Sequence, residues 1–275
     1  MDPVTHLITA PDLAHSLRDV VVLDVRYELG GPDGRGEYAR GHVPGSHYVD
    51  LDAELAGPPG DGGRHPLPDP AVVEAALRRC GVDDDSSVVV LDGRESFAAA
   101  RAWWVLRWLG LEDVRVLDGG YAAWLRANLP VSTEVPEDGH GTFTARPGRL
   151  PVLDADGAAR LARTGLLLDS RSAERYRGEV EPIDAVAGHI PGAVSSPTTD
   201  WLAADGTFRK DLAEHWTEVV GGRDPSVVGT YCGSGVTAAH QALALAEIGV
   251  DARLYPGSWS EWIRDPSRPI ATGPE

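Results

Sequence analysis

The sequence contains few cysteines and no long hydrophobic run. Its 275 residues include only two cysteines, Cys80 and Cys232, which excludes a disulfide framework and favours a reducing compartment. No stretch of about 20 apolar residues occurs, so a membrane-spanning helix is not expected. The N-terminal residues Met1-Asp2-Pro3-Val4 lack the basic segment and the apolar run of a secretory signal. We therefore expect a cytoplasmic protein with no membrane partner.

Basic residues are also scarce, and nearly all of them are arginine. The formal net charge is −17, and Lys210 is the single lysine. Proteins that bind nucleic acid need an excess of Lys and Arg to neutralise phosphates, so we expect no nucleic-acid partner. Neither cysteine has a nearby Cys or His at zinc-site intervals, and no nucleotide-binding glycine fingerprint occurs. The sequence therefore predicts no metal and no cofactor.

The chain contains an internal repeat. Four segments recur in the same order and with similar spacing. The pairs are 22–26 with 167–171, 41–45 with 188–192, 88–92 with 228–232, and 117–124 with 255–262. Such ordered self-similarity indicates two copies of one domain, at about 1–133 and 151–275. The segment 134–150 is rich in Gly, Pro and charge, and we expect an ordered linker there.

Short apolar runs alternate with helical patterns in both copies. Strands are predicted at 20–23, 88–91, 114–117, 166–168, 227–231 and 252–255, and helices at 69–79, at 98–109 and from residue 237. This alternation predicts an α/β fold in which each copy is a parallel sheet flanked by helices. In such sheets, functional sites lie beyond the carboxyl ends of the strands.

The candidate reactive residue lies in a glycine-rich loop between a predicted strand and a predicted helix. The loop is Cys232-Gly233-Ser234-Gly235-Val236-Thr237. The glycines let successive N–H groups turn inward, and the start of the helix adds a positive partial charge. Because a thiol in such a place ionises more readily than a free thiol, we predict that Cys232 is a nucleophile. Cys80 ends a helix after two arginines and is expected to be passive.

Together with the two Asp-x-Arg and two Gly-His-[Val/Ile]-Pro-Gly motifs, this loop resembles the tandem-domain rhodanese-like sulfurtransferases. The resemblance covers nearly the whole chain. It implies an enzyme whose second domain is catalytic and whose first domain is not, since Asp92 stands where the first copy would carry its cysteine. It also implies the reaction, in which Cys232 takes sulfur from a small anionic donor and forms a persulfide. The acceptor would be a thiol, such as that of thioredoxin, or cyanide.

The resemblance also bears on the donor. Members that prefer thiosulfate often carry two basic residues after the cysteine, whereas Gly233 and Ser234 are neutral here. This loop is similar to that of the 3-mercaptopyruvate branch, which implies a proton relay of Ser234, His65 and Asp52. An Asp-x-Arg pair at a strand end, by contrast, is expected to brace a loop.

The same branch binds the carboxylate of the donor with two arginines, and the second one departs from the pattern. Arg175 resembles the first arginine, but Ile183-Asp184 stands where the second is expected. Arg177 or Arg94 are candidate substitutes. The predicted substrate-binding residues are Arg175, Arg177, Gly233, Gly235, Val236 and Thr237.

Two other hypotheses stay open at this point, and a third is nearly excluded. A thiosulfate:cyanide sulfurtransferase would use the same chemistry with another donor, and the missing second arginine favours it. A non-catalytic binding protein with a relic site is disfavoured by the intact cysteine loop. A phosphatase of similar fold would need an arginine six residues after the cysteine, where this chain has Ala238.

Overall fold

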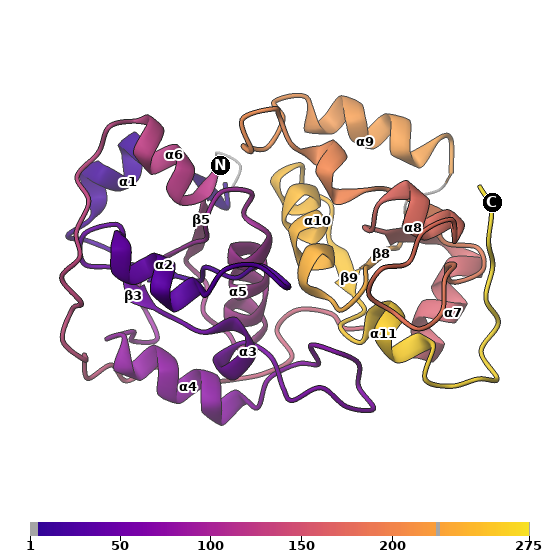
Figure 1. Ribbon diagram of the computed structural model, residues 1–275, viewed down its shortest axis with the longest axis horizontal. Coiled ribbons are helices and arrows are strands. Elements are labelled where there is room, and N and C mark those ends of the chain that lie inside the picture. The colour runs from indigo at the N-terminus through magenta and orange to yellow at the C-terminus, as the bar shows by residue number, and fades with distance from the viewer. Residues whose placement is uncertain (1–4, 224–225, 275) are drawn as a thin grey trace. The chain divides into compact units, whose positions relative to one another are not determined.

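The structure is a computed structural model that describes residues 5–223 and 226–274. The chain divides into two compact units, shown in Figure 1. Unit 1 comprises Met1–Gly57, Pro68–Leu150 and Ala204–Thr207, and unit 2 comprises Pro58–Leu67, Pro151–Ala203 and Phe208–Glu275. The units follow the internal repeat except that two short segments are exchanged. One of them, Pro58–Leu67, carries His65 into unit 2.

Unit 1 is built on a five-stranded parallel sheet with the order β1-β5-β4-β2-β3. Its strands are β1 (Leu7–Ile8), β2 (Val21–Asp24), β3 (His47–Tyr48), β4 (Val88–Leu91) and β5 (Val114–Leu117). Its helices are α1 (Ala10–Ser16), α2 (Gly34–Arg40), α3 (Leu51–Glu54), α4 (Pro70–Arg79), α5 (Phe97–Trp108) and α6 (Gly120–Arg126). One face of the sheet packs on α1 and α6 through a core that includes Leu13 and Trp124.

Unit 2 contains a four-stranded parallel sheet with the order β7-β6-β8-β9. The strands are β6 (Leu166–Asp169), β7 (Val194–Ser195), β8 (Val228–Tyr231) and β9 (Ala252–Leu254). The helices are α7 (Ala155–Thr164), α8 (Ala173–Arg177), the 3₁₀ helix η1 (Thr198–Trp201), α9 (Leu212–Val220), α10 (Val236–Glu247) and α11 (Ser258–Trp262). Residues from α7, α8 and α11 share one core with Leu167 of β6 and Tyr231 of β8.

The two sheets have the same strand order, which confirms the repeat and the predicted fold class. The order β3-β2-β4-β5-β1 in unit 1 corresponds to β7-β6-β8-β9 in unit 2. A parallel bridge between Val152 and Leu254 occupies the place that β1 takes beside β5. The predicted strands 88–91 and 114–117 have the observed bounds, and the other predicted bounds differ by one residue.

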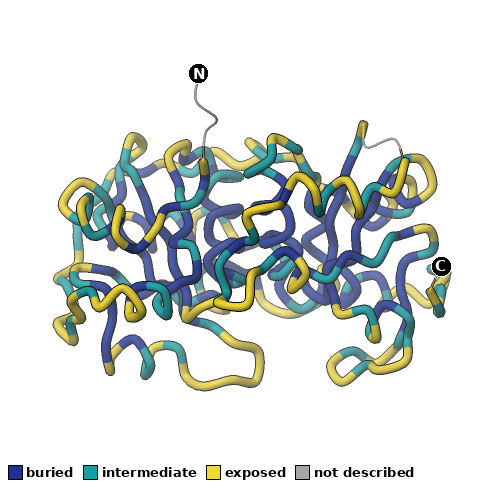
Figure 2. Tube along the Cα trace, turned by 90° about the horizontal axis from the view of Figure 1, so that it is seen from above, coloured by how far each residue is buried: buried dark blue, intermediate teal, exposed yellow. Residues whose placement is uncertain are grey.

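Burial explains why these runs form central strands. Every residue of β4 and of β6 is buried, as expected for a parallel sheet covered on both faces. In Figure 2 the buried stretches of the trace, in dark blue, lie mostly in the interior, and the exposed stretches, in yellow, mostly on the outside. Each buried Val or Leu contributes about 1.5–3 kcal/mol relative to exposure, so these runs are strongly held inside. Cys232 and its twin Asp92 come directly after the strands β8 and β4. Both therefore lie at the carboxyl edge of a sheet.

The Asp-x-Arg motifs brace loops, as predicted. In unit 2, Arg171 donates to both oxygens of Asp169 and to the backbone carbonyl of Gly188, and all of these groups are buried. Arg26 makes the same contacts to Asp24 and to the carbonyl of Gly41 in unit 1. The arginine thus joins a strand end to the Gly-His-[Val/Ile]-Pro-Gly turn in each unit.

The segment 134–150 lies with unit 1 and contains no helix or strand. Its backbone is nevertheless hydrogen-bonded. The N–H groups of Gly139, Gly141 and Phe143 donate to the carbonyls of Arg79, Arg78 and Val82.

Among the residues that the structure describes, no helix has the length and apolar character needed to cross a bilayer.

Candidate active site

The Cys232 loop turns two backbone N–H groups toward the sulfur. The N–H of Gly235 donates to Cys232 Sγ at 3.1 Å, and the N–H of Ser234 approaches the same atom at 3.4 Å. Gly235 precedes α10 with a φ of 82°, in the left-handed region that glycine tolerates best. This local bend directs the start of α10 and its partial positive charge at the thiol. The two N–H donors and the start of the helix therefore both face Cys232 Sγ.

Helix α11 holds the outside of this loop in place. The N–H groups of Trp259 and Ser260 donate to the carbonyls of Cys232 and Gly233 at 3.0 and 2.9 Å. The N–H of Cys232 itself donates to Ser258 Oγ at 3.1 Å. With the carbonyls held outward, the N–H groups of the loop face the sulfur. Ser258 was not among the predicted site residues, although its position after the last predicted strand of the repeat was a usable signal.

Unit 1 carries the same loop with a carboxylate in place of the thiol. One oxygen of Asp92 accepts from the N–H groups of Arg94 and Ser96, both at 3.0 Å. The other oxygen accepts from the N–H groups of Ala98 and Ala99 at 2.9 and 3.3 Å. Burial raises the pKa of Asp92, and these four donors act in the opposite direction. The repeated loop is therefore a backbone arrangement suited to a buried anion.

His65 and Ser234 meet in unit 2 although 169 positions separate them in the sequence. His65 Nδ1 lies 2.7 Å from Ser234 Oγ, and both side chains are buried. The hydroxyl can therefore exchange a proton with the imidazole two residues from the thiol. Asp52 lies on α3 in unit 1, where Tyr27 is hydrogen-bonded to it. Burial, followed by the charge of Asp50, raises the pKa of Asp52.

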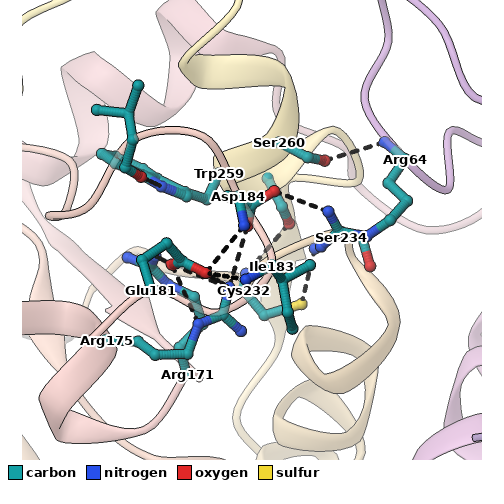
Figure 3. A network of polar contacts seen from close by, with 12 residues as sticks. Arg64, Arg171, Arg175, Glu181, Ile183, Asp184, Cys232, Ser234, Trp259 and Ser260 are labelled. Atoms are coloured by element: carbon teal, nitrogen blue, oxygen red, sulfur yellow. Dashed lines mark hydrogen bonds and ion pairs between the residues drawn. The ribbon is translucent and has the colours of Figure 1, made fainter. Parts of the chain in front are cut away.

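Arg175 is held by acidic residues of the chain itself. Its guanidinium makes a bidentate contact with Glu181 at 2.8 and 3.1 Å, and it also bonds Asp184 at 3.0 Å. A second arginine, Arg64, bonds the other oxygen of Asp184 at 2.7 Å. Figure 3 shows this network beside Cys232. Arg64 was not among the predicted site residues.

The network is close to neutral in charge. Three arginines, Arg64, Arg171 and Arg175, pair with three carboxylates, those of Asp169, Glu181 and Asp184. Burial alone would raise the pKa of Glu181, but hydrogen bonds from Arg175 and from two backbone N–H groups outweigh it, so its pKa lies below the ordinary value. The carboxylate of Glu181 is therefore ionised at neutral pH.

The remaining predicted binding residues divide into two groups. Val236 and Thr237 form the first turn of α10, next to the two N–H donors already described. Arg177 pairs with Glu179 at 2.8 Å on the exposed end of α8, and Arg94 is a mostly exposed residue of unit 1. Neither arginine takes part in the network around Asp184 as far as residues 5–223 and 226–274 describe it.

Two further observations concern cofactors and the other thiol. Within the described part of the chain, no group of three or more His, Cys, Asp or Glu side chains is placed to hold a metal ion.

Cys80 is buried, and burial raises its pKa to about 12. A thiol with that pKa is protonated at neutral pH, so Cys80 is a poor nucleophile.

Comparisons with known proteins agree with this geometry. A family model described as Rhodanese-like domain matches residues 9–127 and 154–265. The chain is 46% identical over 278 residues to a Pseudomonas aeruginosa protein provisionally named 3-mercaptopyruvate sulfurtransferase, with 97% of this chain and 98% of that protein covered. It is also 46% identical over 287 residues to a Mycobacterium tuberculosis (strain H37Rv) protein provisionally named thiosulfate sulfurtransferase SseB, with 97% of each covered.

Solved structures give the same result. The crystal structure of SseA from Escherichia coli, described as a 3-mercaptopyruvate sulfotransferase, matches with a TM-score of 0.80 and 33% identity. The match covers 94% of this chain and 100% of the SseA chain. Both units of the chain are therefore included in the likeness.

Proposed function

This chain belongs to the rhodanese-like domain family and is a sulfurtransferase, and from that premise we propose that it takes sulfur from 3-mercaptopyruvate onto Cys232. The single observation that carries the proposal is the pair of backbone N–H groups directed at Cys232 Sγ. Donors in this position stabilise the attacking thiolate and the persulfide anion that replaces it. The Asp92 loop, where four N–H groups bind a carboxylate, supports the same use of the backbone.

The proposed first step joins two sulfur atoms. The thiolate of Cys232 attacks the thiol sulfur of 3-mercaptopyruvate, an S–S bond forms, and the C–S bond of the donor breaks. The electron pair of that bond stays on carbon as the enolate of pyruvate, which is then protonated. In the second step, a thiolate or cyanide attacks the outer sulfur, and the S–S bond breaks to return the Cys232 thiolate. No redox cofactor is needed, because both steps are displacements at sulfur.

Ser234 and His65 are proposed to move the proton in the first step. The donor thiol must lose a proton, and the enolate must gain one. A hydroxyl 2.7 Å from an imidazole can pass that proton in both directions. We propose Asp52 as the carboxylate of this relay, as the family resemblance implies. A general acid–base pair of this kind contributes about 10²–10⁴ in rate.

A second candidate donor is thiosulfate. The relative from M. tuberculosis that is named for this donor is as similar to the chain as the one named for 3-mercaptopyruvate. Ile183 also leaves the second arginine position without a charge. Against this donor, Gly233 and Ser234 offer no side-chain cation beside Cys232. Thiosulfate therefore ranks second.

The two donors can be separated by one set of kinetic measurements. We expect kcat/KM to be higher for 3-mercaptopyruvate than for thiosulfate, and mass spectrometry to find one added sulfur atom on Cys232 after incubation with the donor. Cys232→Ser should abolish this addition, whereas Cys80→Ser is the matched control and should retain it. A strong preference for thiosulfate would refute the proposed donor. Full activity of Cys232→Ser would refute the proposed carrier.

The relay has a test of its own, because sulfite leaves thiosulfate without needing a proton. Ser234→Ala should slow sulfur uptake from 3-mercaptopyruvate by about 10²-fold or more and leave uptake from thiosulfate much less affected. Equal losses with both donors would show that Ser234 only supports the loop.

For the acceptor we propose a protein thiol, such as that of thioredoxin, or cyanide. We also propose a cytoplasmic location, where the two free thiols would stay reduced.

A further inference from the structure

The carboxylate of Asp184 lies between two guanidinium groups that come from distant segments of unit 2. Arg64 Nη1 bonds one oxygen at 2.7 Å, and Arg175 Nη2 bonds the other at 3.0 Å (Figure 3). The side chain of Asp184 is only 5% exposed, and those of Arg64 and Arg175 are 21% and 16% exposed. Two arginines on opposite oxygens of one carboxylate form a binding site for a carboxylate. In this structure the chain fills that site itself.

This pair of arginines borders the residue next to Cys232. A methyl group built on Gly233 would lie 3.0 Å from Arg64 Nη2 and 3.5 Å from Arg175 Nη2. Both guanidinium groups therefore reach the backbone of the loop that holds the sulfur. An anionic donor bound by the arginines would therefore lie beside the residue that follows Cys232 in the chain.

Arg64 has a free donor and a fixed backbone. Its Nε is buried and makes no hydrogen bond to the residues that the structure describes, so a donor atom is available for a further acceptor. Its backbone N–H donates to Ser260 Oγ at 3.0 Å, which ties the residue to α11. Ile183, by contrast, is 45% exposed and carries no charge. Arg64 is thus a cation beside the loop, whereas position 183 carries none.

We propose that Arg64 and Arg175 bind the carboxylate of the sulfur donor, and that Asp184 is the internal counter-ion which this carboxylate displaces. The inference rests on the proposed function, since it takes the donor to be an α-keto acid. Asp184 can leave the arginines because it lies in a surface turn in which Pro182, Ile183 and Ala185 are exposed. The exchange keeps the partly buried arginines paired in both states, so neither guanidinium group is left without a partner.

The proposal predicts opposite effects for two substitutions. Arg64→Ala removes one cation and should raise KM for 3-mercaptopyruvate about ten-fold or more, with a much smaller change in kcat. Arg64→Lys should restore part of the loss, because it keeps the charge without the bidentate geometry. Asp184→Asn keeps the shape of the side chain but removes the competing charge, so it should lower KM several-fold.

Arg264→Ala is the matched control. Arg264 is half exposed and contacts Asp61, on the same segment that carries Arg64, at 3.8 Å. This variant should leave KM and kcat unchanged. Circular dichroism and tryptophan fluorescence would check that all variants are folded. An unchanged KM in folded Arg64→Ala, or a raised KM in Asp184→Asn, would overturn the proposal.

A binding measurement separates this proposal from the proposed function. Pyruvate, which shares the α-keto acid group, can be titrated calorimetrically into the Cys232→Ser variant, where no sulfur transfer is expected. Adding Arg64→Ala should weaken pyruvate binding, and adding Asp184→Asn should tighten it. If the wild-type protein used thiosulfate but not 3-mercaptopyruvate, the proposed donor would fail, while the pyruvate titration would still decide the binding site. Pyruvate affinity that neither substitution changes would refute the site whichever donor is used.

Discussion

Replacing Gly235 by alanine tests whether the backbone of the Cys232 loop, rather than any one side chain, carries the chemistry. The new methyl group would lie well under 3.0 Å from the carbonyl oxygen of Pro256 and 3.0 Å from its Cα. Both neighbours are backbone atoms, so they cannot move aside as the end of a flexible side chain would. In addition, the φ of 82° disfavours any residue with a side chain.

The magnitude follows from these two effects. A left-handed conformation costs an L-residue about 1–2 kcal/mol, and overpacking a rigid contact costs about 1–3 kcal/mol more. Gly249 provides the control, since its φ of 75° is similar but a methyl group there would meet nothing within 4 Å. Gly249→Ala should therefore lose only the conformational part. The difference between the two variants isolates the contact with Pro256.

Two assays test this prediction. Urea unfolding monitored by tryptophan fluorescence should give a loss about 1–3 kcal/mol larger for Gly235→Ala than for Gly249→Ala. Persulfide formation should slow by about 10²-fold in Gly235→Ala, because relief of the contact shifts the N–H that lies 3.1 Å from Cys232 Sγ. Gly249→Ala should react at the wild-type rate. Equal stability losses, or normal persulfide formation in Gly235→Ala, would refute the reasoning.

Three further predictions concern single groups. Because burial raises the pKa of Cys80 to about 12, iodoacetamide at pH 8 should leave Cys80 unmodified in the native protein, as peptide mass spectrometry can check. Ser258→Ala removes the acceptor of the Cys232 N–H and should cost about 1–3 kcal/mol in urea unfolding; a loss under a few tenths would contradict this. Glu181 has a lowered pKa, so its stabilisation is present above its unfolded pKa and is lost as the pH falls through the folded value. The difference in unfolding free energy between wild type and Glu181→Gln should therefore shrink below about pH 4, and a difference independent of pH would count against it.

Local sequence was sufficient to predict the frame of the site. Valine-rich and leucine-rich runs such as 88–91 form buried strands wherever two helix layers cover them. The glycine at 235 marks the bend between β8 and α10, and the cysteine three residues earlier is thereby placed at the helix N-terminus. These features depend on residues within one or two turns of each other. They could therefore be predicted without knowing the rest of the fold.

The partners of that loop were decided only by the tertiary structure. The sequence indicated His65 through a resemblance alone, and it assigned no role to Arg64, which meets Asp184 across 120 positions of the chain. It also implied that Arg175 binds substrate, but not that Glu181 and Asp184 neutralise it. A side chain carries no local signal of a partner so far away, because such a contact forms only when the fold brings Pro58–Leu67 beside the strand ends of unit 2. The pattern of residues therefore determined where the thiol lies, while the folded chain determined which charges surround it.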